Sequence, residues 1–153
     1  MRPEEFAGWL PVAQERYAQD LARSFGVDIE TARAQATRDA QRFFPDDLLA
    51  AGHAVSVIEA DGERVGELWL GDGDGEFQRS LFVYDIHVDE RHRGRGIGRR
   101  AMLLAEDEAR RRGHDRISLN TMGDNEMARH LYRSLGYTET FVSMEKTLPP
   151  EPA

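Results

Sequence analysis

The chain contains no cysteine. Disulfide bonds, thiolate metal ligands and thiol nucleophiles are therefore excluded, and the absence fits a reducing compartment, so a cytoplasmic location is expected. No apolar stretch approaches the roughly 20 residues that a membrane-spanning helix requires. The first residues are acidic where a secretory signal would be apolar. We therefore expect no membrane partner.

Positive charge is in the minority, because the net charge is -8 and the sequence pI ≈ 5.1. Such a chain has no long-range attraction to nucleic acid or to anionic membranes. With 153 residues, 40% of them hydrophobic, it can bury one sizeable core but is too short for two ordinary domains. We expect one domain over residues 1–153 and no nucleic-acid partner.

Apolar periodicity and turn residues predict helices and strands that alternate along the chain. The expected helices are 3–25, 29–44, 97–113 and 125–135. The expected strands are 53–60, 64–70, 79–88, 115–120 and 137–148. Three strands in an antiparallel meander, followed by strand–helix units, indicate a mixed α/β (α+β) fold. Its mixed sheet is covered by helices on both faces.

Glycine and arginine gather in the stretch ERHRGRGIGRR, residues 90–100, between the strand that ends near Val88 and the helix that begins near Gly98. Glycine lets the backbone approach a ligand closely, because no Cβ intervenes. Free amide groups and the positive end of a helix dipole attract an anion at such a position. A pyrophosphate is a natural ligand, and a flexible, arginine-rich surface loop is the alternative.

Two common phosphate-binding motifs do not fit this turn. Gly94, Gly96 and Gly98 are spaced G-x-G-x-G, whereas a dinucleotide-binding turn requires G-x-G-x-x-G. A P-loop requires lysine and then serine or threonine after its last glycine, but Arg99 and Arg100 follow here. The sequence therefore predicts neither a nicotinamide-dependent enzyme nor an NTPase.

No metal site is expected. Asp72, Asp74 and Glu76 alternate as in a calcium loop, but Phe77 replaces its glycine and Val83 replaces its final glutamate. Four of the histidines show no convergent ligand spacing, and a solvated surface is expected for most of them: His53, His92, His114 and His130.

Two segments resemble the GNAT superfamily of N-acetyltransferases. The stretch DIHVDERHRGRGIGRRAM carries the family turn Arg/Gln-x-x-Gly-x-Gly/Ala, matched by Arg93, Gly96 and Gly98. The stretch NEMARHLYRSLGY, residues 125–137, is similar to the later family segment Asn-x-x-Ala-x-x-Leu-Tyr-x-x-x-Gly-Phe/Tyr. The two stand in the family's order. One departure is that only Met1 and Arg2 precede the first helix, so the family's first strand is short or absent.

The resemblance implies the family's fold and its cosubstrate, acetyl-CoA. Two parallel strands, 84–88 and 115–120, would splay apart, and Ile86 and Val88 would pair their backbone groups with pantetheine. A main-chain N–H nearby would polarise the acetyl carbonyl. Asn125 would contact the pantetheine arm or a bound water, or would cap its helix. The pyrophosphate would be held by the turn residues Arg93, Gly94, Arg95, Gly96, Gly98 and Arg99.

The resemblance also implies a catalytic acid, because Tyr132 matches the family tyrosine that donates to the CoA sulfur. The alternative is a tyrosine that packs in the core. For the base, Asp85 and His87 project from one face of their strand, and either can accept the amine proton through water. Glu67 is a third candidate. A structural carboxylate and a packed histidine are the alternative interpretations.

The predicted function is transfer of an acetyl group from acetyl-CoA to a primary amine of a small molecule or peptide, by direct attack in a ternary complex. A catalytically silent acyl-CoA sensor on the same fold is the first alternative. A nucleic-acid module is the second, but the acidity of the chain and the absence of interleaved aromatic residues count against it. The sequence leaves open the acceptor, the acyl-chain preference and a homodimer. The nucleic-acid module would use Arg91, Arg93, Arg95, Arg99 and Arg100.

Overall fold

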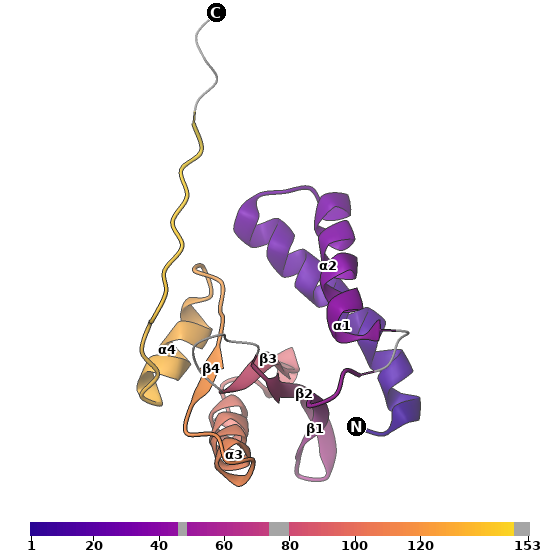
Figure 1. Cartoon of the computed structure of the whole chain (residues 1–153), viewed down its shortest axis with the longest axis vertical. Coiled ribbons are helices and arrows are strands. Elements are labelled where there is room, and N and C mark those ends of the chain that lie inside the picture. The colour runs from indigo at the N-terminus through magenta and orange to yellow at the C-terminus, as the bar shows by residue number, and fades with distance from the viewer. Residues whose placement is uncertain (46–48, 74–79, 149–153) are drawn as a thin grey trace, which may run out of the picture.

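The computed structural model describes residues 1–45, 49–73 and 80–148 (Figure 1). Its helices are α1 (Pro3–Phe25), α2 (Ile29–Phe43), the 3₁₀ turn η2 (Glu90–His92), α3 (Ile97–Arg111) and α4 (Glu126–Ser134). Its strands are β1 (Ala54–Ala60), β2 (Glu63–Asp72), β3 (Leu81–Val88) and β4 (Ile117–Leu119). Residues 74–79 lie outside the described residues, and they include the end of the expected turn over 71–75 and residue 79, the first of the expected third strand. No helix in the described ranges is long and apolar enough to cross a membrane.

The first two helices form an antiparallel pair whose boundaries follow from local chemistry. Gly26 ends α1 in the left-handed conformation, with φ +64°. Asp28 then caps α2 by accepting a hydrogen bond from Thr31 N at 2.9 Å. Within the described residues no strand precedes α1, as expected, although the Met1 amino group donates to Val55 O on β1 at 2.8 Å.

The sheet has the order β1-β2-β3-β4. Its first three strands form an antiparallel meander, and β3 and β4 are parallel. Asp61 and Gly62 make the first hairpin turn, both with positive φ, which matches the twist of the flanking strands. The mixed, mostly antiparallel sheet predicted from the sequence is confirmed.

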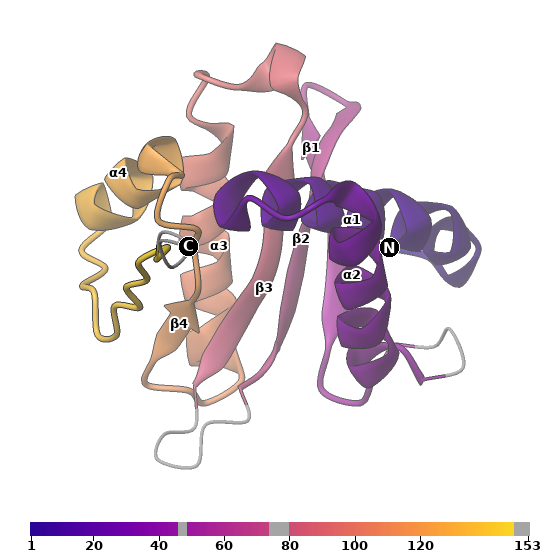
Figure 2. The same cartoon turned by 90° about the horizontal axis from the view of Figure 1, so that it is seen from above.

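Helices cover both faces of the sheet (Figure 2). On one face, α1 and α2 pack over an aromatic cluster that includes Trp9, Phe44 and Trp69. On the other face, α3 buries Met102 completely against Leu81 and its neighbours. Helix α4 lies beside α3, beyond β4. The sheet therefore lies between the α1–α2 pair and α3.

A β-bulge changes the direction of side chains in the middle of the sheet. The β2–β3 register shifts between Trp69 and Leu70. As a result, Tyr84 and Asp85 both reach the α1 side, although they are consecutive in the chain. Tyr84 stacks on Trp69 with ring centroids 4.8 Å apart, and Asp85 accepts a hydrogen bond from Arg16 on α1 at 3.2 Å.

The prediction of a final strand over 137–148 is wrong. Residues 138–148 form no strand and make no backbone hydrogen bond with the described part of the chain. Their apolar side chains are exposed, Phe141 by 86%, Val142 by 65% and Met144 by 91%. The alternation of apolar residues indicates a strand, but a strand also needs a neighbouring edge, and in this single chain no edge lies beside the segment. The expected stop at Pro149 and Pro150 lies outside the described residues.

Candidate active site

The two parallel strands separate after a short paired region, as the resemblance to the GNAT family implied. Backbone pairing joins only Leu81–Val83 to Ile117–Leu119. Strand β3 then continues to Val88, while β4 ends at Leu119. Among the described residues no strand lies beside the β4-facing edge of residues 84–88. This edge therefore offers free N–H and C=O groups to an extended ligand.

The glycine turn lies at the end of this free edge. Gly94 and Gly96 adopt positive φ angles of 72° and 77°, which other residues rarely adopt. The first helical hydrogen bond of α3 runs from Arg100 N to Gly96 O at 3.0 Å. The amides of residues 94–99 find no acceptor among the described residues. Unbonded amides at a helix N-terminus, together with the dipole of α3, are suited to an anion.

Arginine side chains around the turn bind protein acceptors. Arg93 Nε donates to Val88 O at 2.9 Å. Arg95 lies 3.5 Å from the Asp61 carboxylate in the β1–β2 turn, and Arg99 donates to Ser134 on α4. Three of the five arginines that would make a nucleic-acid surface therefore contact protein groups near the turn instead. The groups left available to an anion at the turn are therefore chiefly the backbone amides.

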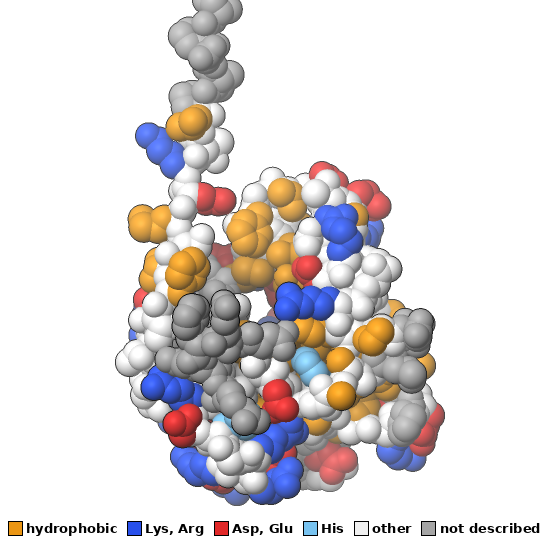
Figure 3. Space-filling view, viewed as in Figure 1, with side chains coloured by type: hydrophobic (Ala, Val, Ile, Leu, Met, Phe, Trp, Pro, Cys, Tyr) orange, Lys and Arg blue, Asp and Glu red, His pale blue; other side chains and the backbone are white. Residues whose placement is uncertain are grey.

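One cavity of about 1790 Å³ joins the glycine turn to the free strand edge. It is larger than the roughly 300–1,000 Å³ of a typical ligand pocket. Figure 3 shows the hollow between the α1–α2 pair and the α4 side. Two candidates lie elsewhere: Arg95 does not line this cavity, and Glu67 opens onto a smaller pocket beside α1. The predicted residues that line the large cavity are Asp85, Ile86, His87, Val88, Arg93, Gly94, Gly96, Gly98, Arg99, Asn125 and Tyr132.

A charge network connects the candidate bases. Arg16 lies 3.5 Å from Glu67 and 3.2 Å from Asp85, and Arg64 lies 2.9 Å from Glu67. The Glu67 side chain is 11% exposed, so it is a buried carboxylate held between two guanidinium groups. Arg16 is a site residue that was not predicted from the sequence. Its signal is a charged residue on the apolar face of the first helix, three positions after Ala13.

Burial and charge tune Asp85 and His87 in opposite directions. Surrounding protein atoms raise the pKa of Asp85, although 37% of its side-chain surface is exposed, and the nearby Arg16 opposes this shift. Burial lowers the pKa of His87, and Arg16 lowers it further. The imidazole is therefore neutral near pH 7, with Nε2 3.5 Å from Asp89. The ionised carboxylate of Asp85 and the neutral imidazole of His87 can each accept a proton.

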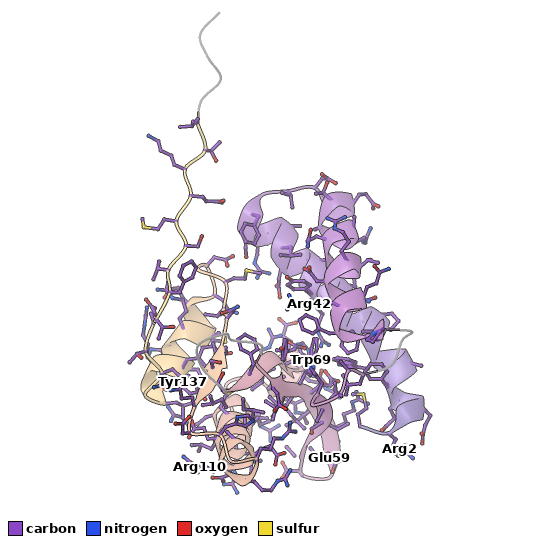
Figure 4. The ribbon with its side chains drawn as sticks, viewed as in Figure 1. Arg2, Arg42, Glu59, Trp69, Arg110 and Tyr137 are labelled. Atoms are coloured by element: carbon purple, nitrogen blue, oxygen red, sulfur yellow. The ribbon has the colours of Figure 1, made fainter. Side chains whose placement is uncertain are left out.

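Tyr132 enters the cavity from α4. Burial raises the pKa of its hydroxyl, and the Asp85 carboxylate raises it further, so Tyr132 stays protonated. Its ring lies 5.9 Å from that of Tyr137, which Figure 4 labels at the foot of α4. The Tyr132 hydroxyl has no hydrogen-bond partner among the described residues. Asn125 caps the same helix, because its Oδ1 accepts from Ala128 N at 3.1 Å.

The expectation of solvated histidines is wrong for three of the four. His92 is buried, 8% exposed. His114 is bonded to Asp72 at 3.1 Å, and His53 accepts a hydrogen bond from Trp69 Nε1 at 3.0 Å. Local packing against aromatic and acidic neighbours explains these positions. Among residues 1–45, 49–73 and 80–148, no group of His, Asp and Glu is arranged to hold a metal ion.

Separated parallel strands, a glycine turn at a helix N-terminus and a cavity that joins them define the acetyltransferase class. The family model "Acetyltransferase (GNAT) family" matches residues 15–137. The chain belongs to this family and is a GNAT acetyltransferase.

Relatives cover almost the full chain. "Uncharacterized N-acetyltransferase YdgE" of Bacillus subtilis is 28% identical over 97% of this chain and 95% of its own length. The crystal structure of the "Putative Acetyltransferase (YycN)" of Bacillus subtilis, also 28% identical, has a TM-score of 0.88 and covers 97% of this chain and 96% of its own. A "Mycothiol acetyltransferase" of Beutenbergia cavernae is 32% identical over 95% of this chain but only 45% of its own length.

Proposed function

We propose that the protein is an N-acetyltransferase that transfers an acetyl group from acetyl-CoA to a primary amine of a small molecule or peptide. The amine attacks directly, with both substrates bound. The observation that carries the proposal is the free edge of β3 at residues 84–88, which ends at a turn with unbonded amides and lies in the same cavity. N-acetyltransferases among the relatives support it.

The residues present fit acetyl-CoA, whose thioester supplies the activated acetyl group. Amides of residues 94–99 suit its pyrophosphate. The backbone at Ile86 and Val88 suits the pantetheine amides, and an N–H on this edge stabilises negative charge on the carbonyl oxygen. Asn125 Oδ1 is used to cap α4, so its side-chain nitrogen is the group left for the pantetheine arm or a bound water.

Tyr132 is the proposed general acid. Its raised pKa keeps the proton on the hydroxyl until the thiolate leaves. The hydroxyl has no partner among the described residues, so it is free to donate to the sulfur.

Asp85 and His87 are the proposed bases, acting through water. Both line the cavity. The positive charge of Arg16 opposes the rise in the pKa of Asp85 that burial causes, and so favours the ionised carboxylate. Glu67 lies behind Arg16 and opens onto a different pocket. We therefore assign Glu67 to the charge balance of Arg16 rather than to proton transfer.

The acceptor enters from the side of α1 and α2. This wall of the cavity carries the rings of Phe43, Trp69 and Tyr84, which contact one another with centroids 4.8–5.5 Å apart. An aromatic wall suits an amine whose neighbouring carbon skeleton is apolar.

A panel of primary amines and peptides, scored for release of free CoA, tests the proposal. We expect turnover with at least one acceptor, and acetyl-CoA binding measured by calorimetry. A protein that binds acetyl-CoA but acetylates no amine in a broad panel would instead be a sensor. A protein that does not bind acetyl-CoA would refute the assignment of the cavity.

A further inference from the structure

The sheet and its core are incompletely covered along β4. All three residues of β4 are only half-buried, and no backbone hydrogen bond reaches its outer edge from the described residues. Helix α4 is amphipathic, yet none of its residues is buried. Ile117 and Leu119 of β4, with Leu135 after α4, contact the core from partly exposed positions. An edge strand of this kind is a template for a further strand.

The segment 138–148, called here the tail, has the properties of such a strand. Glu139 is held to α4 by Arg129 at 3.1 Å, and the tail then leaves the body of the molecule (Figures 1 and 4). Val142, Met144 and Leu148 fall on one face of an extended chain, and they are exposed by 65%, 91% and 74%. Several exposed apolar residues in one segment mark an interaction surface.

The tail does not lie on its own β4. In Figure 1 it runs away from the sheet, and in Figure 2 it projects toward the viewer while β4 lies in the plane. Within the described residues, the extended tail and the outer edge of β4 are therefore both unpaired and do not meet in one chain.

We propose that the protein forms a two-fold homodimer in which the tail of each chain adds as a strand to the β4 edge of the other. The two contacts are identical, so the assembly closes at two copies. Main-chain hydrogen bonds along β4 supply the pairing, and the apolar face of the tail covers the half-buried side chains of β4 and α4. This inference is independent of the acetyl transfer reaction.

Light scattering after size-exclusion chromatography tests the dimer. Wild-type protein should have twice the 17.4 kDa mass of the chain at micromolar concentration. A double variant, Val142→Asp with Met144→Asp, should have the mass of one chain and should keep the helical circular dichroism signal, because no helix lies in the tail. Leu104→Asp on α3, equally apolar and 58% exposed, is the matched control and should stay dimeric. A monomeric wild type, or a dimeric tail variant, would overturn the proposal.

Crosslinking distinguishes exchange of tails from other dimers. Because the chain has no cysteine, two introduced thiols are the only reactive ones. One chain carries Ser143→Cys in the tail and an affinity tag, and the other carries Asn120→Cys just after β4; both positions are exposed. After the two proteins are mixed and equilibrated, a short bismaleimide should join tagged to untagged chains. Failure to form this product would contradict the exchange. With both cysteines in one chain, a crosslink confined to monomers would show that the tail folds back on its own β4.

Discussion

Arg16 lies 3.2 Å from Asp85, and this ion pair joins helix α1 to the strand edge where acyl transfer is proposed. The same guanidinium lies 3.5 Å from Glu67, so one cation serves two carboxylates on neighbouring strands. Burial of Asp85 favours its neutral form, and Arg16 favours its ionised form. The balance between them sets the pH at which Asp85 can act as a base.

Removing this cation should move the pH–rate profile. In Arg16→Gln the cation that lowers the pKa of Asp85 is gone, while burial still raises it, so the pKa of Asp85 should rise. If ionised Asp85 is the base, the acidic limb of kcat should then shift to higher pH. The pH dependence of kcat between about pH 5 and about pH 9 measures this shift.

Arg16→Lys is the control, because it keeps the charge while it loses the second guanidinium nitrogen. Its acidic limb should lie closer to that of the wild type. An identical limb in Arg16→Gln and wild type would show that Asp85 does not control the rate.

Replacing the two candidate bases separately should identify the one that is used. Asp85→Asn or His87→Gln should depress the rate mainly at low pH, where the amine is most protonated, and should leave acetyl-CoA affinity nearly intact. Rates of both variants across the pH range, with calorimetric affinities, provide the measurement. Unchanged rates in both would assign the proton to bulk water or to another group.

His87 should also make stability depend on pH. Its folded pKa is lowered below the ordinary histidine value of 6.5, so below that value the unfolded chain binds more protons than the folded one. Acid therefore favours unfolding as pH falls through the window between the two pKa values. Chemical denaturation at about pH 7 and about pH 5 should show a larger loss of unfolding free energy in wild type than in His87→Gln. Equal losses would mean that His87 titrates alike in both states.

Most of the fold could be predicted because its signals are local. The first helix, 3–25, has the predicted boundaries, and the Asp61–Gly62 turn fixes the first hairpin. The final strand could not be predicted correctly, because strand formation depends on a neighbouring edge as well as on alternation. The alternating apolar residues of the tail predict a strand, but among the described residues of one chain no neighbouring strand pairs with it.

The candidate site could be predicted where a backbone motif defines it. The glycine turn and Tyr132 lie in sequence segments with fixed spacing. Arg16 could not be found in this way, because it approaches Asp85 from 69 positions away along the chain. Contacts of that kind depend on helix packing and on the β-bulge, which turns Asp85 toward α1.

The glycine turn should tolerate added charge poorly. Gly96→Glu places a carboxylate beside the proposed pyrophosphate and forces a residue with a Cβ into a φ of +77°. The strained backbone should lower the free energy of unfolding by about 1–2 kcal/mol. Acetyl-CoA affinity, measured by calorimetry, should fall much more than this strain explains.

Gly26→Glu is the matched control for that variant. Gly26 also has a positive φ, +64°, and open space around its Cβ position, but it ends α1 and does not line the cavity. It should lose similar stability and keep its acetyl-CoA affinity. Equal affinities in the two folded variants would refute the placement of the pyrophosphate.

The hydroxyl of Tyr132 should matter for turnover and little for binding. Tyr132→Phe removes the proton donor and keeps the ring that packs against Tyr137. General acid catalysis typically contributes about 10²–10⁴-fold, so kcat should fall within that range. Acetyl-CoA affinity should change little, because the interaction with the leaving sulfur develops in the transition state. Tyr137→Phe is the control: the Tyr137 hydroxyl is buried and the residue does not line the cavity, so its kcat should match wild type. Steady-state rates with a responsive amine compare the two, and full turnover in Tyr132→Phe would exclude this hydroxyl as the acid.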